Sequence, residues 1–350
     1  MEESKNTNYN SIDLAKFIAA VAIIVLHTAP FSDVSKYLNV ITRDYIVILA
    51  VPFFFIASAF LFFKKANSET DNSRIKHFSK RIVVMYLIWS AVYFIFILYK
   101  WIALKEFTKY SIPIYIRDFF FVGSYSTIWF LPALLVGVII VYFLKKKFTI
   151  NQILAISFVV YIFTLLGSSY FGVTTKIPFL KTIYDSYFYV FDTVKNGVLF
   201  AFPYAAIGAK IAETDYKTIK LSKSIISFII SMILMLIEVV LQLKFKLNTN
   251  GVDTILFLIP SSYFMFVSLL NINIKGNVAV YKKLRNCSML MFLSQRIFLT
   301  IYPFVFPKIG LSYVVNNSIL YFSAILISTL LFSMIIIMLS NKFKILKKLY

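Results

Sequence analysis

The chain alternates between long runs of apolar residues and shorter polar connections, and the length of the runs is its most informative pattern. A helix that crosses a bilayer needs about 20 mostly apolar residues. Ten runs come close to this length, namely residues 12–30, 40–63, 82–100, 127–144, 150–167, 197–212, 222–243, 253–271, 286–306 and 317–340. Residues 112–125 form a shorter segment that suits the membrane interface. The pattern predicts an all-α, polytopic integral membrane protein with about ten transmembrane helices.

The connections between the runs leave no room for a second folded unit. The longest one, residues 167–196, contains apolar stretches of its own, so residues 1–350 are expected to form a single membrane domain. The one cysteine, Cys287, lies at the start of the ninth run, which excludes a disulfide framework or a cysteine-based metal site. We therefore expect neither a bound metal nor a bound cofactor.

Composition agrees with this class, and the placement of charge adds an orientation. A hydrophobic fraction of 60% and a mean hydropathy of +0.82 exceed what a soluble surface can accommodate. With the N-terminus in the cytoplasm, 22 of the 36 lysines and arginines lie on the cytoplasmic side and 12 on the other. This asymmetry predicts cytoplasmic N- and C-termini. The net charge of +21 then reflects topology and attraction to anionic lipid, so nucleic acid is not an expected partner.

Three ionisable residues interrupt the first apolar run: Asp13 and Lys16 near its start and His27 near its end. Because a helix turns by ~100° per residue, Lys16 and His27 project from one face, roughly 16 Å apart along the axis, with Asp13 close to the same line. Ionisable groups in hydrocarbon cost ~2.5–3.5 kcal/mol each, so this face is expected to point into the bundle or a wet cavity. The alternative for Asp13 and Lys16 is that they extend to the membrane surface. The other histidine, His77, lies in a basic connection and is expected to be solvated.

Two adjacent pairs of opposite charge occur at or near the apolar runs. Arg43 with Asp44, and Arg117 with Asp118, are expected to neutralise each other locally. Glu238, in the middle of the seventh run, is expected to face a lysine or arginine of another helix. The sequence does not identify that partner.

A further polar group precedes the sixth run. Asp192 and Lys195 are three positions apart, which is the spacing of an ion pair on a helix that we expect to begin there, and Asn196 follows directly. The two charges either pair with each other or bind a polar ligand.

In sequence, the chain resembles the membrane-bound acyltransferase 3 family over nearly its whole length. The resemblance rests on Ser11–Ala20 with His27-Thr28, on Val51-Pro52-Phe53-Phe54-Phe55 with Ser58, and on Trp129-Phe130-Leu131, in the order that the family shows. Within the family, the chain is similar to the transmembrane half of the membrane-bound serine racemases of vancomycin resistance, which share a segment like Asp192–Gly197 ahead of an apolar helix. Neither the soluble racemase half nor the esterase-like domain of other members is present in these 350 residues.

The resemblance implies transfer of an acyl group, commonly acetyl from cytoplasmic acetyl-CoA, to a hydroxyl of a cell-envelope sugar or polysaccharide at a bacterial plasma membrane. The family's first helix carries an arginine followed eleven positions later by a histidine; Lys16 stands at the arginine position and His27 matches the histidine. Imidazole can take the proton of an attacking hydroxyl near neutral pH, so His27 is the candidate catalytic base. The candidate substrate- or donor-binding residues are Asp13, Lys16, Arg81, Asp192, Lys195 and Asn196, with Lys16 and Arg81 placed to balance donor phosphates.

The sequence departs from the family's pattern at three places. The paired arginines that begin the third span appear as Lys80-Arg81, with Val84 where the second arginine of the motif falls. Ala59 replaces the glycine after Ser58, and Gln295 replaces the histidine of a late motif.

These departures keep an alternative function open. Like the membrane half of the racemase relatives, the chain would carry L-serine or another small amino acid. Asp192 and Lys195 would then take the ammonium and carboxylate groups near the middle of the membrane, and His27 would line the path.

Overall fold

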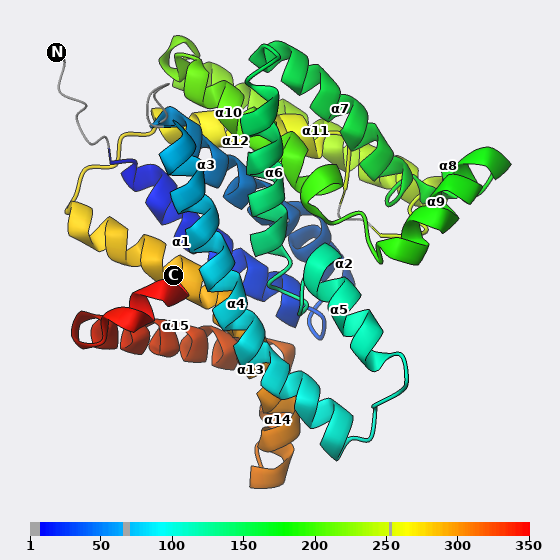
Figure 1. Cartoon of the computed structure of the whole chain (residues 1–350), viewed down its shortest axis with the longest axis vertical. Coiled ribbons are helices and arrows are strands. Elements are labelled where there is room, and N and C mark those ends of the chain that lie inside the picture. Colours follow the sequence, from blue (N-terminus) through cyan, green and yellow to red (C-terminus); the bar gives the residue numbers. More distant parts are fainter. Residues whose placement is uncertain (1–7, 66–70, 252–253) are drawn as a thin grey trace.

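The computed structural model describes residues 8–65, 71–251 and 254–350, and every regular element within them is helical (Figure 1). The longer helices are α1 (Asn10–Thr28), α3 (Ala50–Lys64), α4 (Asp71–Ala103), α6 (Phe130–Leu144), α7 (Ile150–Leu166), α10 (Phe202–Glu213), α11 (Leu221–Lys244), α12 (Leu258–Asn271), α13 (Val278–Val305) and α15 (Ser318–Lys342). The shorter α-helices are α2 (Lys36–Val40), α5 (Ser111–Phe121), α8 (Phe171–Thr174), α9 (Pro178–Val190) and α14 (Ser312–Asn316). π-Helical or 3₁₀ segments are η1 (Ile41–Ile46), η2 (Val47–Leu49), η3 (Gly197–Ala201), η4 (Tyr216–Thr218), η5 (Phe306–Ile309) and η6 (Lys344–Leu349).

Each of the ten apolar runs contains a helix in the described part of the chain, as the sequence predicts. Six helical stretches are long and apolar enough to cross a membrane, whereas α6, α7 and α12 are shorter apolar helices. The described residues therefore confirm an all-helical fold with several candidate spans. The count of ten crossings and the cytoplasmic termini stay predictions.

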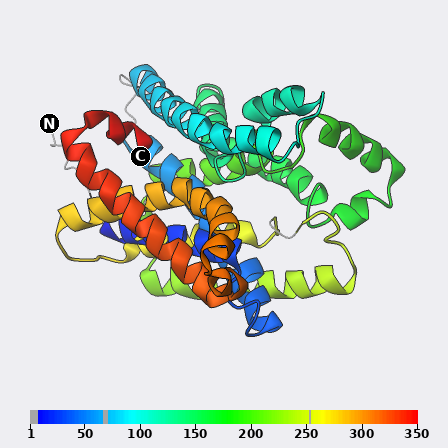
Figure 2. The same ribbon diagram turned by 90° about the horizontal axis from the view of Figure 1, so that it is seen from below.

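Helix α3 lies at the centre of the bundle, and its close contact with α10 depends on small residues (Figures 1 and 2). A Cβ added at Gly208 of α10 would lie 2.5 Å from the carbonyl oxygen of Ile56 and 2.8 Å from the Cβ of Ala59. Small residues on both helices therefore allow the two backbones to approach, as in other membrane helix pairs. Helix α1 packs against α3, α13 and α15, which places its polar face inside the bundle.

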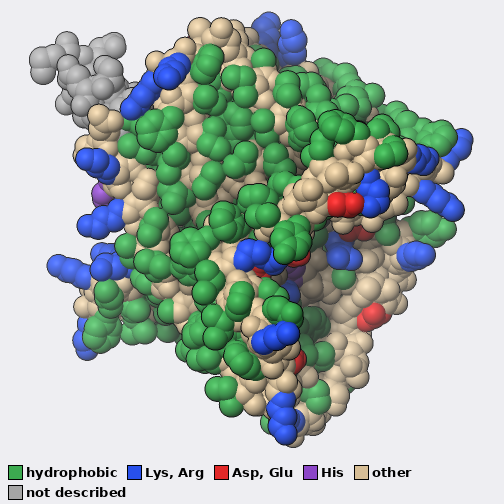
Figure 3. Space-filling view, turned by 45° about the vertical axis from the view of Figure 1, so that its right-hand side comes forward, with side chains coloured by type: hydrophobic (Ala, Val, Ile, Leu, Met, Phe, Trp, Pro, Cys, Tyr) green, Lys and Arg blue, Asp and Glu red, His purple; other side chains and the backbone are tan. Residues whose placement is uncertain are grey.

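The outer surface is apolar over large areas in Figure 3, with lysines and arginines along the left and right edges and a few more in the lower middle of the face. Large hydrophobic side chains are exposed along α11 and α15, including Ile226 at 57%, Ile233 at 53% and Met338 at 71%. An apolar surface of this extent requires a hydrophobic environment. It is the surface expected of a membrane protein.

The partners of Glu238 differ from the prediction. Its carboxylate accepts hydrogen bonds from the Tyr170 hydroxyl (2.8 Å), the Gln242 side chain (3.2 Å) and the backbone N–H groups of Leu256 (2.7 Å) and Phe257 (2.9 Å). The prediction of a lysine or arginine partner was therefore wrong. The N–H groups at the start of α12 have no partner within the helix and carry the positive end of the helix dipole. They therefore stabilise the buried carboxylate.

Two further sequence predictions concern the polar connections. The adjacent pairs are confirmed, with nitrogen–oxygen distances of 3.8 Å for Arg43–Asp44 and 2.6 Å for Arg117–Asp118. His77 is exposed, as expected, but the loop predicted around it was wrong because α4 already begins at Asp71. The first turns of α4 carry polar residues on their exposed face. Their apolar content is therefore too low for the sequence pattern to mark them as part of a span.

Candidate functional site

The polar face of α1 points into the bundle, as the sequence predicts. Asp13 is 6% exposed and Lys16 is 9% exposed, although both belong to a helix of otherwise apolar character. Lys16 lines one cavity and His27 lines another. Helix α1 therefore contributes side chains to two separate cavities, which differ in their polar lining residues.

The cavity around His27 has a volume of about 470 Å³ and is rich in polar groups. We call it the histidine cavity. Its polar and charged lining residues are His27, Asp118, Ser124, Tyr125, Ser126, Thr127, Thr193 and Lys195. Its apolar wall comes mainly from Ile23, Val51, Trp129, Phe200 and Phe292. A hydroxylated ligand beside His27 would thus meet hydroxyl groups, both signs of charge and an aromatic surface.

The loop that supplies these hydroxyl groups is held by tight local geometry. Gly123 has a φ of +113°, and a Cβ there would lie 2.5 Å from the Cα of Trp129. The Gly123 N–H donates to the carbonyl oxygen of Asp118 at the end of α5. The Ser124 N–H donates to the Tyr86 hydroxyl of α4 at 2.9 Å. These contacts fix the loop against α4 and α5, so the hydroxyl groups face the cavity in a defined arrangement.

The second cavity, of about 430 Å³, is strongly basic. We call it the basic cavity. Its basic lining residues are Lys16, Lys65, Arg74, His77, Arg81 and Arg285. They come from α1, the end of α3, α4 and α13, so the fold gathers them from widely separated parts of the sequence. Convergent cations of this kind can form charge-assisted hydrogen bonds with phosphate groups.

Asp13 is an acidic group beside Lys16 and Arg285 of this cluster. Its carboxylate lies 3.6 Å from the Arg285 guanidinium and within electrostatic range of Lys16 and Lys282. Lys16 in turn experiences the positive charge of Arg285 and Arg81. Lys16, Arg81 and Arg285 repel one another, and a bound polyanion would relieve that repulsion.

The two cavities lie one after the other along the same helices. On α1, Lys16 lines the basic cavity and Ile23 the histidine cavity. On α13, Met289 lines the basic cavity and Phe292, less than one turn further, lines the histidine cavity. On α3, Val51 lines the histidine cavity and Phe54 lines the basic cavity. The structure thus places His27 in one cavity and the basic residues in the other, and the two cavities adjoin where the Phe54 ring contacts the Phe292 ring.

The segment before η3 adopts a conformation other than the predicted helix. Residues 191–196 are irregular, and η3 begins only at Gly197, so the helical spacing inferred for Asp192 and Lys195 was wrong. Asp192 is exposed and lines neither cavity, whereas Lys195 lines the histidine cavity. The Asn196 side chain accepts from the N–H groups of Val198 and Leu199 and so caps η3, which explains why the helix starts there.

Several site residues escaped sequence reasoning. Arg285 was counted only as a cytoplasmic charge and Asp118 only as half of a local pair, but each lines a cavity. Arg74 and His77 were placed in a loop. Arg285 lies directly before an apolar run, Asp118 lies in the short interfacial segment, and Arg74 and His77 lie in the polar stretch before a run. A topology argument accounts for such charges without assigning them to a site.

The departures from the family's pattern have structural counterparts. Arg285 of α13 joins Arg81 in the basic cavity, where Val84 supplies no charge. Gln295 is fully buried, and its amide nitrogen donates to the carbonyl oxygen of Phe292 at 3.0 Å within α13, whereas its amide oxygen has no hydrogen-bond partner among the described residues. Ala59 fits because Gly208 faces it.

Comparison with known proteins identifies the family. Residues 9–338 match the acyltransferase 3 family, described as an acyltransferase domain. An amino-acid racemase of Enterococcus faecalis is 26% identical over 97% of this chain and 47% of its own length, and a second is 29% identical over 60% and 29%. A serine/alanine racemase of Enterococcus gallinarum is 25% identical over 74% of this chain and 37% of its own length.

This chain thus spans less than half the length of these curated relatives. No solved structure matches it. The match over nearly the whole sequence confirms the resemblance drawn from the first, second and fourth apolar runs. The chain therefore belongs to the acyltransferase 3 family of integral membrane proteins.

Proposed function

We propose that the chain is a membrane-bound O-acyltransferase of the bacterial plasma membrane. It takes an acyl group, most simply acetyl, from cytoplasmic acyl-CoA and transfers it to a hydroxyl of a cell-envelope sugar or polysaccharide. The observation that carries the proposal is the pairing of a basic cavity with an adjoining histidine cavity.

The basic cavity suits the donor. A coenzyme A ester carries several phosphate groups at one end and a flexible arm that ends in the thioester. Lys16, Arg81 and Arg285 would hold the phosphates, since guanidinium and ammonium groups form charge-assisted hydrogen bonds with them. The apolar residues of the cavity, such as Phe54 and Leu134, then lie on the route of the thioester arm.

The histidine cavity suits the acceptor. An alcohol becomes a competent nucleophile when a base removes its proton in the transition state, and His27 is the one histidine that lines this cavity. The acceptor oxygen would form a bond to the thioester carbon while its proton passes to His27. The carbon–sulfur bond breaks, and the coenzyme leaves as a thiolate that takes up a proton.

The proposal requires the basic cavity to open to the cytoplasm. The charge asymmetry of the sequence supports this orientation, because the basic cavity lies among residues of the cytoplasmic class, including Lys65, Arg74 and Arg285. Tyr350 lines the same cavity as Lys16, which agrees with the two ends of the membrane domain lying on one side.

A second candidate function is transport of a small amino acid. It is favoured by the opposite charges of Asp118 and Lys195, which line the same cavity as His27, and by the names of the racemase relatives. Asp118 takes the place proposed for Asp192, which is exposed outside this cavity. In this case the cavity would bind the ammonium and carboxylate groups of a zwitterion.

The two functions give different results in parallel assays. Bacterial cells that produce the chain are expected to gain base-labile acetyl esters in their envelope glycan, measured as acetate released by mild alkali. Proteoliposomes with the purified chain are expected to accumulate no radiolabelled serine beyond empty liposomes. Serine accumulation without new esters would replace the acyltransferase with the transporter.

A further inference from the structure

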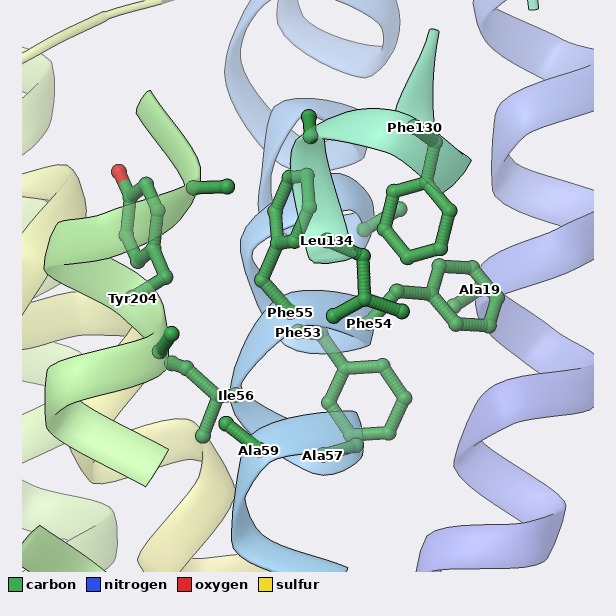
Figure 4. Close-up of a cluster of buried hydrophobic side chains, with 14 of the residues drawn as sticks. Ala19, Phe53, Phe54, Phe55, Ile56, Ala57, Ala59, Phe130, Leu134 and Tyr204 are labelled. Carbon is green, nitrogen blue, oxygen red and sulfur yellow. The ribbon is translucent and has the colours of Figure 1, made fainter. Parts of the chain in front are cut away.

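The layer between the two cavities is a contact of three phenylalanine rings from three helices. Phe54 of α3, Phe130 of α6 and Phe292 of α13 are 6%, 2% and 5% exposed. Their ring centroids lie 6.1 Å (Phe54–Phe130), 5.7 Å (Phe54–Phe292) and 5.2 Å (Phe130–Phe292) apart, so each ring contacts the other two. We call these three residues the phenylalanine barrier. Figure 4 shows Phe54 and Phe130 beside each other, next to Ala19 of α1.

The barrier is only about two rings thick. Phe54 lines the basic cavity and Phe292 lines the histidine cavity, and these two rings touch. On α1, the small side chain of Ala19 lies between Lys16 and Ile23, which line opposite cavities. The bulk of the wall at this level therefore comes from the phenylalanine side chains.

Acyl transfer between the cavities has to take place at this wall. The attacking oxygen beside His27 and the thioester carbon of a donor in the basic cavity must approach to about 3–3.5 Å before a bond forms. The thioester must therefore reach the barrier from the side of Phe54. The acyl chain, which extends beyond the thioester carbon, then needs space that the three rings now fill.

We propose that Phe54, Phe130 and Phe292 determine the length of the transferred acyl group and restrict it to acetyl size; this inference rests on the proposed function. Protein interiors are close-packed, so each added methylene group at the barrier must displace a ring. A methyl group requires a small ring movement, whereas a hexanoyl chain requires a ring to leave the contact. Discrimination of about 10–200-fold per methylene is typical of such pockets.

The test compares chain lengths in membranes that contain the natural acceptor. Membrane vesicles from cells that produce the chain receive radiolabelled acetyl-CoA or hexanoyl-CoA, and base-labile label in the glycan fraction is counted. Wild-type chain is expected to transfer hexanoyl at least about 100-fold more slowly than acetyl. Phe54→Ala and Phe292→Ala are expected to raise the hexanoyl-to-acetyl ratio at least about tenfold. Binding of both esters to the purified chain, measured by calorimetry, should show the same change in preference.

Phe60→Ala is the matched control. Phe60 lies on α3 like Phe54, is fully buried, and its ring contacts Tyr9, Tyr216 and Phe266 away from both cavities. The same truncation there is expected to leave the chain-length ratio unchanged. Because deletion of a buried ring destabilises a protein, Phe54→Leu and Phe292→Leu are measured in parallel and should change the ratio in the same direction by a smaller factor.

The outcomes separate this inference from the proposed function. An unchanged ratio in the Phe54 and Phe292 variants, while acetyl transfer persists, overturns the role of the barrier and leaves the acyltransferase in place. Equal transfer of acetyl and hexanoyl by the wild-type chain has the same consequence. A wild-type chain that neither binds coenzyme A esters nor transfers either acyl group overturns the proposed function, and the inference falls with it.

Discussion

Replacement of His27 by alanine is expected to abolish acyl transfer while the chain still reaches the membrane. Loss of a general base typically lowers the rate by ~10²–10⁴-fold. His27 lines the cavity proposed for the acceptor, so the loss should fall on kcat more than on the KM for the donor. The measurement is incorporation of labelled acetyl groups into envelope glycan, normalised to the amount of chain in the membrane.

His27→Gln separates a base from a polar lining residue. Glutamine keeps hydrogen-bonding groups but takes up no proton near neutral pH, so this variant should be as inactive as His27→Ala. His77→Ala is the comparison: His77 lines the basic cavity and not the histidine cavity, so any loss in this variant should fall on the KM for the donor rather than on kcat. Retention of acetyl transfer by His27→Gln at more than about a tenth of the wild-type rate would contradict a base role.

Replacement of Arg81 by glutamine is expected to weaken use of the donor. Hydrogen bonds to charged groups contribute about 1.5–3 kcal/mol, so loss of one phosphate contact should raise the KM for acetyl-CoA by roughly 10–150-fold. Arg81 lines the basic cavity and not the histidine cavity, so kcat at saturating donor should change little. Initial rates over a range of acetyl-CoA concentrations, in vesicles with the donor on the cytoplasmic face, give both constants.

Arg285→Gln should act in the same direction, since Arg285 lines the same cavity. Arg43→Gln removes an arginine that is paired with Asp44 and lines neither cavity, and it serves as the control. A KM for acetyl-CoA that stays within about twofold of wild type in both Arg81→Gln and Arg285→Gln would show that the basic cavity does not bind the donor phosphates.

The helices could be predicted from the sequence because each apolar run is long enough to carry its own signal. All ten runs contain helices, and the inward face of α1 followed from the spacing of Lys16 and His27. The π-helical segment ahead of α10 did not follow, because it depends on local capping. Asn196 ends the irregular segment because its side chain accepts hydrogen bonds from two backbone N–H groups. The spacing of residues in the sequence does not reveal such a cap. The π-helical and 3₁₀ segments ahead of α3 did not follow either; they have no side-chain cap within the described residues and continue the apolar pattern of the span.

The site could be predicted only where the charges lie inside a span. Lys16 and His27 stand out because hydrocarbon makes an ionisable group costly. Arg285 lies at the end of a span and Asp118 in the short helix α5, where a charge needs no special explanation, and their place in a cavity follows only from the tertiary arrangement. Glu238 shows the opposite error: a buried carboxylate suggested a cationic side chain, but backbone N–H groups bind it instead.

The central claim is that an acyl group enters from the cytoplasmic side at the basic cavity and leaves on a hydroxyl at the histidine cavity. Sealed vesicles of opposite orientation test it most directly, because coenzyme A esters do not cross a bilayer. Inside-out vesicles that receive external labelled acetyl-CoA are expected to form base-labile acetyl esters on luminal glycan, whereas right-side-out vesicles should form them only after permeabilisation. Ester formation in intact right-side-out vesicles, or in neither preparation even after permeabilisation, would contradict the account.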